Sequence, residues 1–231
     1  MRLQVFTDAA TVAFEAAQFI TERAKIRIRH EGRFTLAVSG GSTPWRMLEQ
    51  LSTLPLDWEH VHWFQVDERV AADGDEDRNL TAMKRSLLDL APVPAANVHP
   101  MPVATDDLEL AAVEYAQTLA AFAGSPPVLD LVHLGMGPDG HTASLVPRDS
   151  VLDVNDVDVS LTESPYQGRL RMTLTYPVID RAREILWLMT GESKQEMLAR
   201  LLDADPSIPA GRVDATNAVV FADEAAAAGL G

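Results

Sequence analysis

Short runs of apolar residues recur along this chain, and most are followed by a loop rich in polar residues or glycine. The predicted strands cover residues 3–6, 34–38, 60–66, 128–134, 169–175, 184–189 and 218–221. A continuous apolar run of about four to eight residues is typical of a strand buried on both faces, as in a parallel sheet. Between the runs, apolar residues recur at helical spacing, for example from Val12 to Ala24. This alternation predicts an α/β fold, a three-layer α/β/α sandwich around a mostly parallel sheet.

Residues at the ends of the apolar patterns predict where several helices begin and end. Asp8 is expected to cap the first helix and Gly32 to end it. Pro44 is expected at the first position of the second helix, because the proline ring fixes φ at a helical value and that position needs no N–H donor. Asn79 is expected to cap a further helix that runs to Leu88.

The loop after the run at 128–134 has the composition of a ligand-binding loop. Residues 134–147, LGMGPDGHTASLVP, contain three glycines, which allow a ligand to approach the main chain closely. In open α/β sheets, ligands bind beyond the carboxyl ends of the strands. Asp139 and His141 are therefore expected where chemistry takes place. His133, inside the apolar run itself, is expected to be a core histidine.

A second glycine loop, SGGSTP, lies between the run at 34–38 and a helical pattern. A strand, a glycine loop and a helix N-terminus in sequence present backbone N–H groups and the positive end of the helix dipole to an anion. A Gly-Gly pair at this place also suits a tight turn, so both readings stay open. The candidate anion-binding residues are Ser39, Gly40, Gly41, Ser42 and Thr43.

Charged residues follow the strand predicted at 60–66. Asp67, Glu68 and Arg69 are either a solvated cluster or an active-site acid with an arginine that holds it. Residues 71–78, AADGDEDR, form a polar segment with the composition of a lid.

Composition and charge restrict the partners of this chain. Its formal charge of −15 argues against nucleic acid or an anionic membrane as the main partner, so an anionic ligand needs a local basic pocket. There is no cysteine, which excludes thiolate metal sites and a cysteine nucleophile. His60, His62 and His99 are scattered without ligand spacing, so we predict no structural metal site. Without a long apolar run or a signal-peptide pattern, the expected location is the cytoplasm.

Five motifs, in the same order, resemble those of 6-phosphogluconolactonases. They are SGGSTP at 39–44, DER at 67–69, LGMGPDGHTASL at 134–145, RMTLTYP at 171–177 and G-x-x-K at 191–194. GPDGHTAS is highly specific, whereas the others would be weak alone. A chain of 231 residues with 47% hydrophobic content suits one large α/β domain or two small ones, and we prefer one domain, residues 1–231. The resemblance spans nearly the whole chain and implies a modified Rossmann-like sheet shared with glucosamine-6-phosphate deaminases.

The resemblance implies hydrolysis of 6-phospho-D-glucono-1,5-lactone to 6-phospho-D-gluconate, the second step of the oxidative pentose phosphate pathway. Lactone hydrolysis needs an activated water, an oxyanion site and a proton for the ring oxygen, none of which requires a metal or an organic cofactor. His141 suits the general base because histidine titrates near neutral pH. Asp139 or Asp67 would orient it or hold sugar hydroxyls, and Arg69 with the glycine-loop N–H groups would stabilise developing charge.

The same resemblance places a phosphate site on the loop at 39–43 together with Arg171 and Lys194. The implied partner is a small sugar-phosphate lactone, with no nucleic acid, no membrane and no obligate protein partner.

Two other functions remain possible from the sequence. A glucosamine-6-phosphate deaminase would carry a glutamate shortly after the DGH histidine, where this chain has Val146. A non-catalytic sugar-phosphate sensor would keep the phosphate loop, but no helix-turn-helix segment or basic face accompanies it here.

Overall fold

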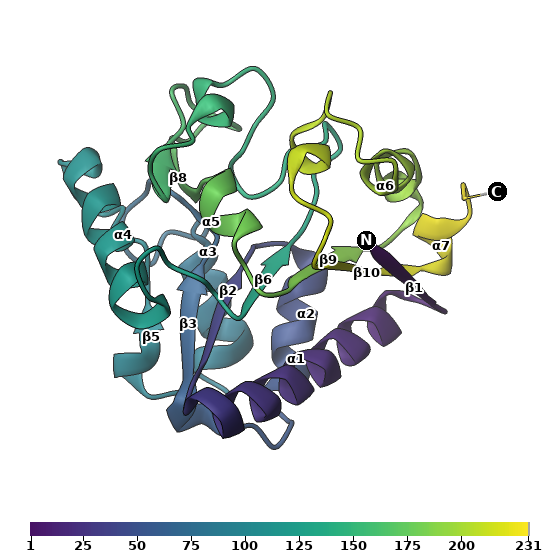
Figure 1. Cartoon of the computed structure of the whole chain (residues 1–231), viewed down its shortest axis with the longest axis horizontal. Helices are drawn as coiled ribbons and strands as arrows, with labels where there is room; N and C mark the ends of the chain where they lie inside the picture. Colours follow the sequence, from purple (N-terminus) through teal and green to yellow (C-terminus); the bar gives the residue numbers. More distant parts are fainter. Residues whose placement is uncertain (231) are drawn as a thin grey trace.

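The computed structural model describes residues 1–230, and its centre is a seven-stranded sheet in which every neighbouring pair is parallel (Figure 1). The strands are β1 (Arg2–Phe6), β2 (Phe34–Val38), β3 (Val61–Gln65), β5 (Val98–His99), β6 (Leu131–Leu134), β9 (Ile185–Met189) and β10 (Ala218–Asp223). Their order is β1-β10-β9-β6-β2-β3-β5. The prediction missed β5, which has only two residues and follows a proline-rich segment.

The strand order reverses direction between β2 and β6. From β2 the chain proceeds outward through β3 to β5, whereas from β6 it proceeds the other way through β9 and β10. The two central strands are paired directly, with Ala37 opposite Val132. At such a switch point the loops after the two strands separate and leave a crevice between them. The two glycine loops singled out in the sequence follow these two strands.

Helices cover both faces of the sheet (Figure 1). One face is covered by α1 (Ala9–Glu31), α2 (Ser42–Leu51), α3 (Asn79–Met83) and a π-helical turn (Lys84–Leu88). The other is covered by α4 (Leu108–Ala123), α5 (Tyr176–Asp180), α6 (Gln195–Leu202) and α7 (Glu224–Ala227). Leu36 and Ala37 illustrate the cause, because successive side chains of a strand point to opposite faces and here join different apolar clusters. The three-layer sandwich is confirmed. Short 3-10 turns occupy Trp58–His60, Ala95–Asn97, Ser150–Asp153, Glu192–Lys194 and Pro209–Arg212.

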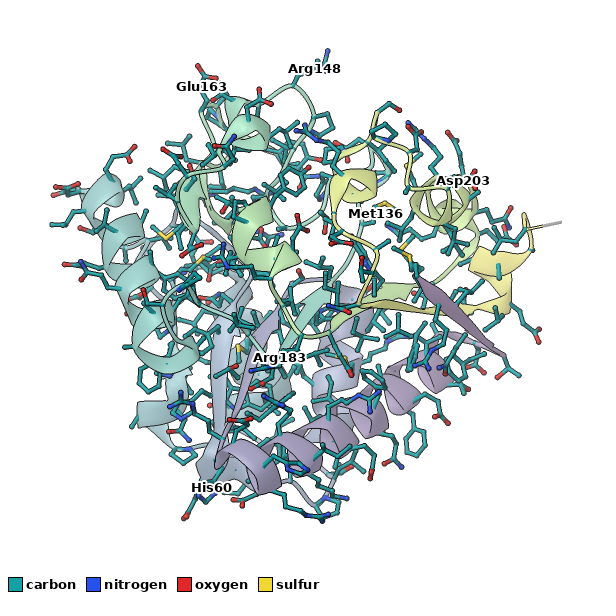
Figure 2. All side chains as sticks on the ribbon, in the orientation of Figure 1. His60, Met136, Arg148, Glu163, Arg183 and Asp203 are labelled. Carbon is teal, nitrogen blue, oxygen red and sulfur yellow. The ribbon has the colours of Figure 1, made fainter. Side chains whose placement is uncertain are left out.

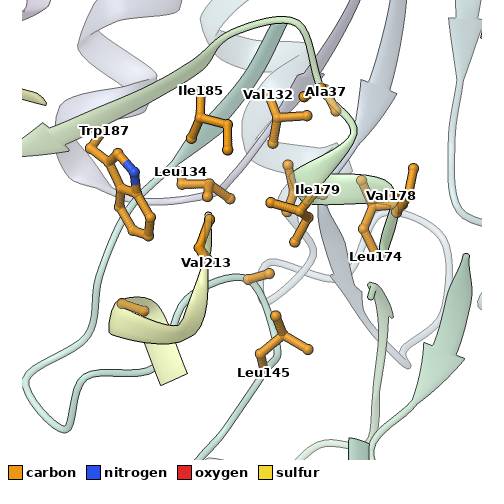
Figure 3. Close-up of a cluster of buried hydrophobic side chains, with 14 of the residues drawn as sticks. Ala37, Val132, Leu134, Leu145, Leu174, Val178, Ile179, Ile185, Trp187 and Val213 are labelled. Carbon is orange, nitrogen blue, oxygen red and sulfur yellow. The ribbon is translucent and has the colours of Figure 1, made fainter. Parts of the chain in front are cut away.

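A second, antiparallel sheet lies beside the main one. It consists of β4 (Asp67–Arg69), β8 (Arg171–Leu174) and β7 (Val159–Leu161), in that order. The alternation of residues 169–175 predicted a strand, but nothing in it indicated pairing with Asp67–Arg69. Leu174 of β8 and Leu145 of the long glycine loop share one apolar cluster with residues of β6 and β9 (Figure 3). The core therefore anchors both the small sheet and the far end of that loop.

The predicted helix ends are partly confirmed. The Asp8 side chain accepts a hydrogen bond from Thr11 N–H at 2.8 Å, and Gly32 ends α1 with φ of 75°. Pro44 is the third residue of α2 and not the first, because the helix already begins at Ser42.

Asn79 was wrongly predicted as a cap, since it is the first residue of α3. Its backbone N–H and that of Leu80 donate to the Glu68 carboxylate at 2.8 and 2.9 Å. Because a carboxylate from another segment satisfies this helix end, the Asn79 side chain is available elsewhere.

The carboxyl ends of the parallel strands face the end of the molecule opposite His60. His60 immediately precedes β3 and lies at one end, whereas Arg148 and Glu163 lie at the other (Figure 2). Within residues 1–230, no helix is both long and apolar enough to cross a membrane.

Candidate functional site

A cavity of about 190 Å³ lies at the switch point between β2 and β6. The predicted site residues that line it are Ser39, Gly40, Gly41, Ser42, Thr43, Asp67, Arg69, His141, Arg171 and Lys194. Asp139 does not line the cavity but contacts His141 from outside it. Segments far apart in the chain thus meet at a single concave surface, as the strand order requires.

The loop at 39–43 has a backbone geometry that only glycine allows. Gly41 has φ of 140° and precedes the first turn of α2. A Cβ on Gly40 would lie 2.1 Å from Oδ1 of Asn79, so the main chain and that side chain are in close contact. The N–H groups of the first turn of a helix have no partner within the helix, which leaves them available to an anion.

His133 stabilises the start of this loop through a hydrogen bond. Its Nδ1 accepts a hydrogen bond from the Ser39 N–H at 3.2 Å. Burial lowers the pKa of His133 to about 3, so the ring is neutral. His133 is a core residue, as expected. Its Nε2, however, has no hydrogen-bond partner within residues 1–230, so only one of the two ring nitrogens is hydrogen-bonded there.

Three cations face the cavity. The Arg171 side chain is only 5% exposed, and its Nη1 lies 3.8 Å from Oδ2 of Asp67. Burial lowers the pKa of Arg171, and the Asp67 carboxylate opposes that shift. Lys194 donates to the main-chain oxygen of Met136, and burial lowers its pKa while Asp139 acts in the opposite direction. Arg69 donates from Nη1 to the main-chain oxygen of Asp77 at 2.6 Å, and its buried Nε has no partner in the described part of the chain.

His141 and Asp139 form a close pair. Nδ1 of His141 lies 2.6 Å from Oδ1 of Asp139. Burial acts to raise the pKa of Asp139, but hydrogen bonds from His141 and Tyr166 outweigh it and the pKa is lowered. Asp139 is therefore ionised beside the ring. Of the two aspartates considered from the sequence, Asp139 is the one hydrogen-bonded to His141.

Asp67 has a different environment, deep in the cavity wall. It accepts a hydrogen bond from Ser144 Oγ at 2.6 Å and a longer one from Asn79 Nδ2 at 3.4 Å. With Arg171 also nearby, its carboxylate is surrounded by donors. These contacts hold the wall of the cavity and relate Asp67 to the guanidinium of Arg171.

Two glycines of the loop at 134–147, Gly137 and Gly140, allow His141 to take its position. A Cβ on Gly137 would lie 2.0 Å from Cε1 and 2.1 Å from Nδ1 of His141. Gly140 has φ of 80°, and a Cβ there would lie 2.6 Å from Cβ of Ile208. The ring can occupy its place beside Asp139 only because residue 137 has no side chain.

Two residues of the site could not be identified from the sequence. Asn79 lies in a helical pattern and Tyr166 in a weakly patterned polar stretch, yet Asn79 lines the cavity and Tyr166 contacts the Asp139–His141 pair. These contacts join segments that only folding brings together. Glu68 belongs to the charged cluster named in the sequence, but it is fully buried and paired at 3.3 Å with Arg78, whose side chain is 2% exposed, so it is not solvated.

The segment at 71–78 is tied down at several points. Besides the Arg78–Glu68 pair, Asp75 and Asp77 accept hydrogen bonds from Arg169 at 3.1 and 3.0 Å. Whether this segment moves as a lid stays a prediction.

Among residues 1–230, no three His, Asp or Glu side chains are arranged to hold a metal ion. Val146 is buried and does not line the cavity.

Comparison with known proteins adds independent information. Residues 7–222 match the family model of glucosamine-6-phosphate isomerases/6-phosphogluconolactonase. The 6-phosphogluconolactonase of Synechocystis sp. is 40% identical over 193 residues, which cover 81% of this chain and 80% of that protein.

Solved structures show the same fold. The 6-phosphogluconolactonase of Trypanosoma brucei superposes with a TM-score of 0.86 and 26% identity, covering 100% of this chain and 98% of that one. A monomeric glucosamine-6-phosphate deaminase has a TM-score of 0.87 at 18% identity, covering 99% of this chain and 100% of that one, so that likeness concerns the fold alone. The match to the family model over nearly the whole chain places this protein in the glucosamine-6-phosphate isomerase/6-phosphogluconolactonase family.

Proposed function

We propose that this protein hydrolyses 6-phospho-D-glucono-1,5-lactone to 6-phospho-D-gluconate, in the oxidative pentose phosphate pathway. The observation that carries the proposal is one cavity lined by a carboxylate-bound histidine, a helix N-terminus, the buried Arg171 and the half-buried Lys194. Such a site supplies a base and anion-binding groups in one cavity. The 40% identity to a 6-phosphogluconolactonase supports this choice of substrate.

His141 is the proposed general base. Its Nδ1 lies against the ionised Asp139, which favours a proton on Nδ1 and leaves the lone pair on Nε2. Nε2 takes a proton from water as the water oxygen bonds to the lactone carbonyl carbon. The protonated imidazole then gives that proton to the ring oxygen of the lactone, as the bond between this oxygen and the carbonyl carbon breaks. Both transfers use Nε2, so the histidine returns to its starting protonation state, and the carboxylic acid that forms loses its proton to solvent to give the gluconate.

The charge that develops on the carbonyl oxygen needs donors at a fixed place. Backbone N–H groups of the two glycine loops and the guanidinium of Arg69 line the same cavity and suit this role. These groups are held before the substrate arrives, so little reorganisation is required. Nothing in the step requires a metal ion or an organic cofactor.

Phosphate recognition is assigned to other groups that line the same cavity. Arg171 and Lys194 would donate charge-assisted hydrogen bonds, and the N–H groups at residues 39–43 would complete the cradle. The chain carries a formal charge of −15 and repels a phosphorylated ligand at long range, so such short contacts must supply the affinity.

Deamination of glucosamine-6-phosphate is the nearest alternative, because the fold is shared. A deaminase would carry a glutamate at the position of Val146, whose side chain here is apolar, buried and outside the cavity. No observation favours this alternative over hydrolysis.

The test is hydrolysis of freshly generated 6-phosphogluconolactone, corrected for spontaneous hydrolysis, with and without EDTA. We expect acceleration in both conditions. His141→Asn should lose about 10² to 10⁴ in kcat while retaining substrate binding, because general-base assistance is worth that much. His60→Asn, an exposed histidine before β3, is the matched control. Ammonia release from glucosamine-6-phosphate without lactone hydrolysis would refute the proposal.

A further inference from the structure

The chain between β7 and β8 forms a tight hairpin that carries Tyr166 to the site. Tyr166 N–H donates to the oxygen of Arg169 at 2.9 Å, and Arg169 N–H donates back at 3.3 Å. Between them Gln167 and Gly168 have φ of 51° and 84°. Two central residues with positive φ define the type I′ turn, whose twist matches that of the flanking strands. Tyr166 is therefore held at a defined place at the end of a hairpin.

The phenol of Tyr166 meets both members of the Asp139–His141 pair. Its oxygen lies 2.9 Å from Oδ2 of Asp139 and 3.0 Å from Nδ1 of His141. The rings of His141 and Tyr166 are 5.0 Å apart and meet edge to face at 66°. An ionised carboxylate only accepts hydrogen bonds, so the single phenolic hydrogen points to Asp139. The oxygen lone pairs are then left facing Nδ1 of His141.

We propose that Tyr166 is a positioning residue that keeps His141 in the tautomer able to act as a base. Two acceptors, the Asp139 carboxylate and the phenolic oxygen, converge on Nδ1 and favour a proton there. The lone pair then lies on Nε2, the nitrogen left for the attacking water. This inference rests on the proposed lactone hydrolysis, and it adds a residue that neither the motifs nor the comparisons assign.

The surroundings of Tyr166 fit this role. The Arg171 guanidinium carbon lies 5.1 Å from the ring centroid, and its Nε donates to the Tyr166 main-chain oxygen at 3.3 Å. Burial, with the hydrogen bond to Asp139, raises the pKa of Tyr166 to about 12. The phenol thus stays protonated and remains a donor at any pH at which the enzyme would work. The Arg171 guanidinium packs against the ring and helps to hold it in place.

Tyr166→Phe removes only the hydroxyl and keeps the ring. We expect kcat to fall about ten-fold, the value of one hydrogen bond to a charged group, with little change in KM or in thermal stability. In a His141→Asn background the same change should cause no further loss, because the base it positions is gone. Tyr176→Phe is the control, since its hydroxyl donates to the main-chain oxygen of Pro209 at 2.9 Å and does not line the cavity.

A second readout does not depend on catalysis. Nitrogen-15 NMR of the histidine rings at alkaline pH, with His141 assigned from the spectrum of His141→Asn, should show the Nδ1-protonated tautomer in the wild type. Tyr166→Phe should shift the His141 signals toward the Nε2-protonated form.

Three results would overturn the inference. They are an unchanged kcat with unchanged His141 shifts, a rise in KM at constant kcat, and an equal loss in the His141→Asn background. If the wild type does not hydrolyse the lactone, the proposed function fails. The NMR comparison still decides whether Tyr166 sets the tautomer.

Discussion

Adding one methyl group at Gly137 should displace the proposed base without touching it chemically. The methyl carbon of Gly137→Ala would lie 2.0 Å from Cε1 of His141, 2.1 Å from its Nδ1 and 2.9 Å from Oδ1 of Asp139. Non-bonded carbon atoms rest about 3.5 to 4.0 Å apart. Gly137 does not have a positive φ, so alanine is not excluded by the backbone itself. The imidazole, rather than the main chain, is expected to give way.

The size of the effect follows from these distances. The ring must move by about 1.5 Å to relieve the contact. The bond of 2.6 Å between His141 and Asp139 would then exceed the range of a hydrogen bond. A misplacement of about 1 Å can cost about 10²-fold in rate, so we expect kcat to fall by at least about that factor.

The assay compares kcat and KM for fresh 6-phosphogluconolactone with melting temperature and with calorimetric binding of 6-phosphogluconate. We expect kcat alone to change strongly, because the phosphate cradle lies on other loops. Gly229→Ala is the control, since its Cβ would meet Cβ of Gln195 at an ordinary 3.4 Å. Combining Gly137→Ala with His141→Asn should add no further loss. A folded Gly137→Ala protein with wild-type kcat would refute either the position of the ring or its role as base.

Three further predictions concern phosphate binding, pH and stability. Lys194→Met and Arg171→Met should each weaken binding of the phosphorylated lactone about ten-fold to a hundred-fold and hardly affect hydrolysis of unphosphorylated gluconolactone. The double variant should lose less binding free energy than the two single variants added together. Equal losses on both lactones would show that the phosphate site is misplaced. Burial lowers the pKa of His133 from 6.5 to about 3, so only the unfolded chain takes up its proton as pH falls below about 6.5. Through this residue, the free energy of unfolding in urea should be about 2 kcal/mol lower at about pH 5 than at about pH 7. His133→Asn should reduce this pH dependence, and an unchanged pH dependence would contradict the prediction. Glu68→Gln removes the buried carboxylate that pairs with Arg78 and leaves that guanidinium only the exposed Asp73 carboxylate, so it should cost about 3 to 5 kcal/mol. Glu76→Gln, in an exposed ion pair, should lower the melting temperature far less; similar melting temperatures for the two would contradict this.

Much of the main sheet and of its loops was predictable because the relevant physics is local. A run such as FTLAV at residues 34–38 must be buried on both faces, and the structure buries all five residues. Asp8 and Gly32 mark the ends of α1 through hydrogen bonds and backbone angles within a few residues. The glycine loops after β2 and β6 follow from the same pattern, since parallel strands bring their carboxyl ends to one edge.

The tertiary structure alone decided which side chains meet within that edge. Ser144 bonds to Asp67 across 77 positions of sequence, and Tyr166 reaches Asp139 across 27. The pairing of Asp67–Arg69 with Arg171–Leu174 likewise joins distant segments into a sheet that no single pattern indicates. Local sequence patterns were enough to identify the residue types and loops of the site. The choice of Asp139 over Asp67 as the partner of His141, and the places of Asn79 and Tyr166, depend on how remote segments pack, because a side chain's neighbours are set by packing and not by sequence distance.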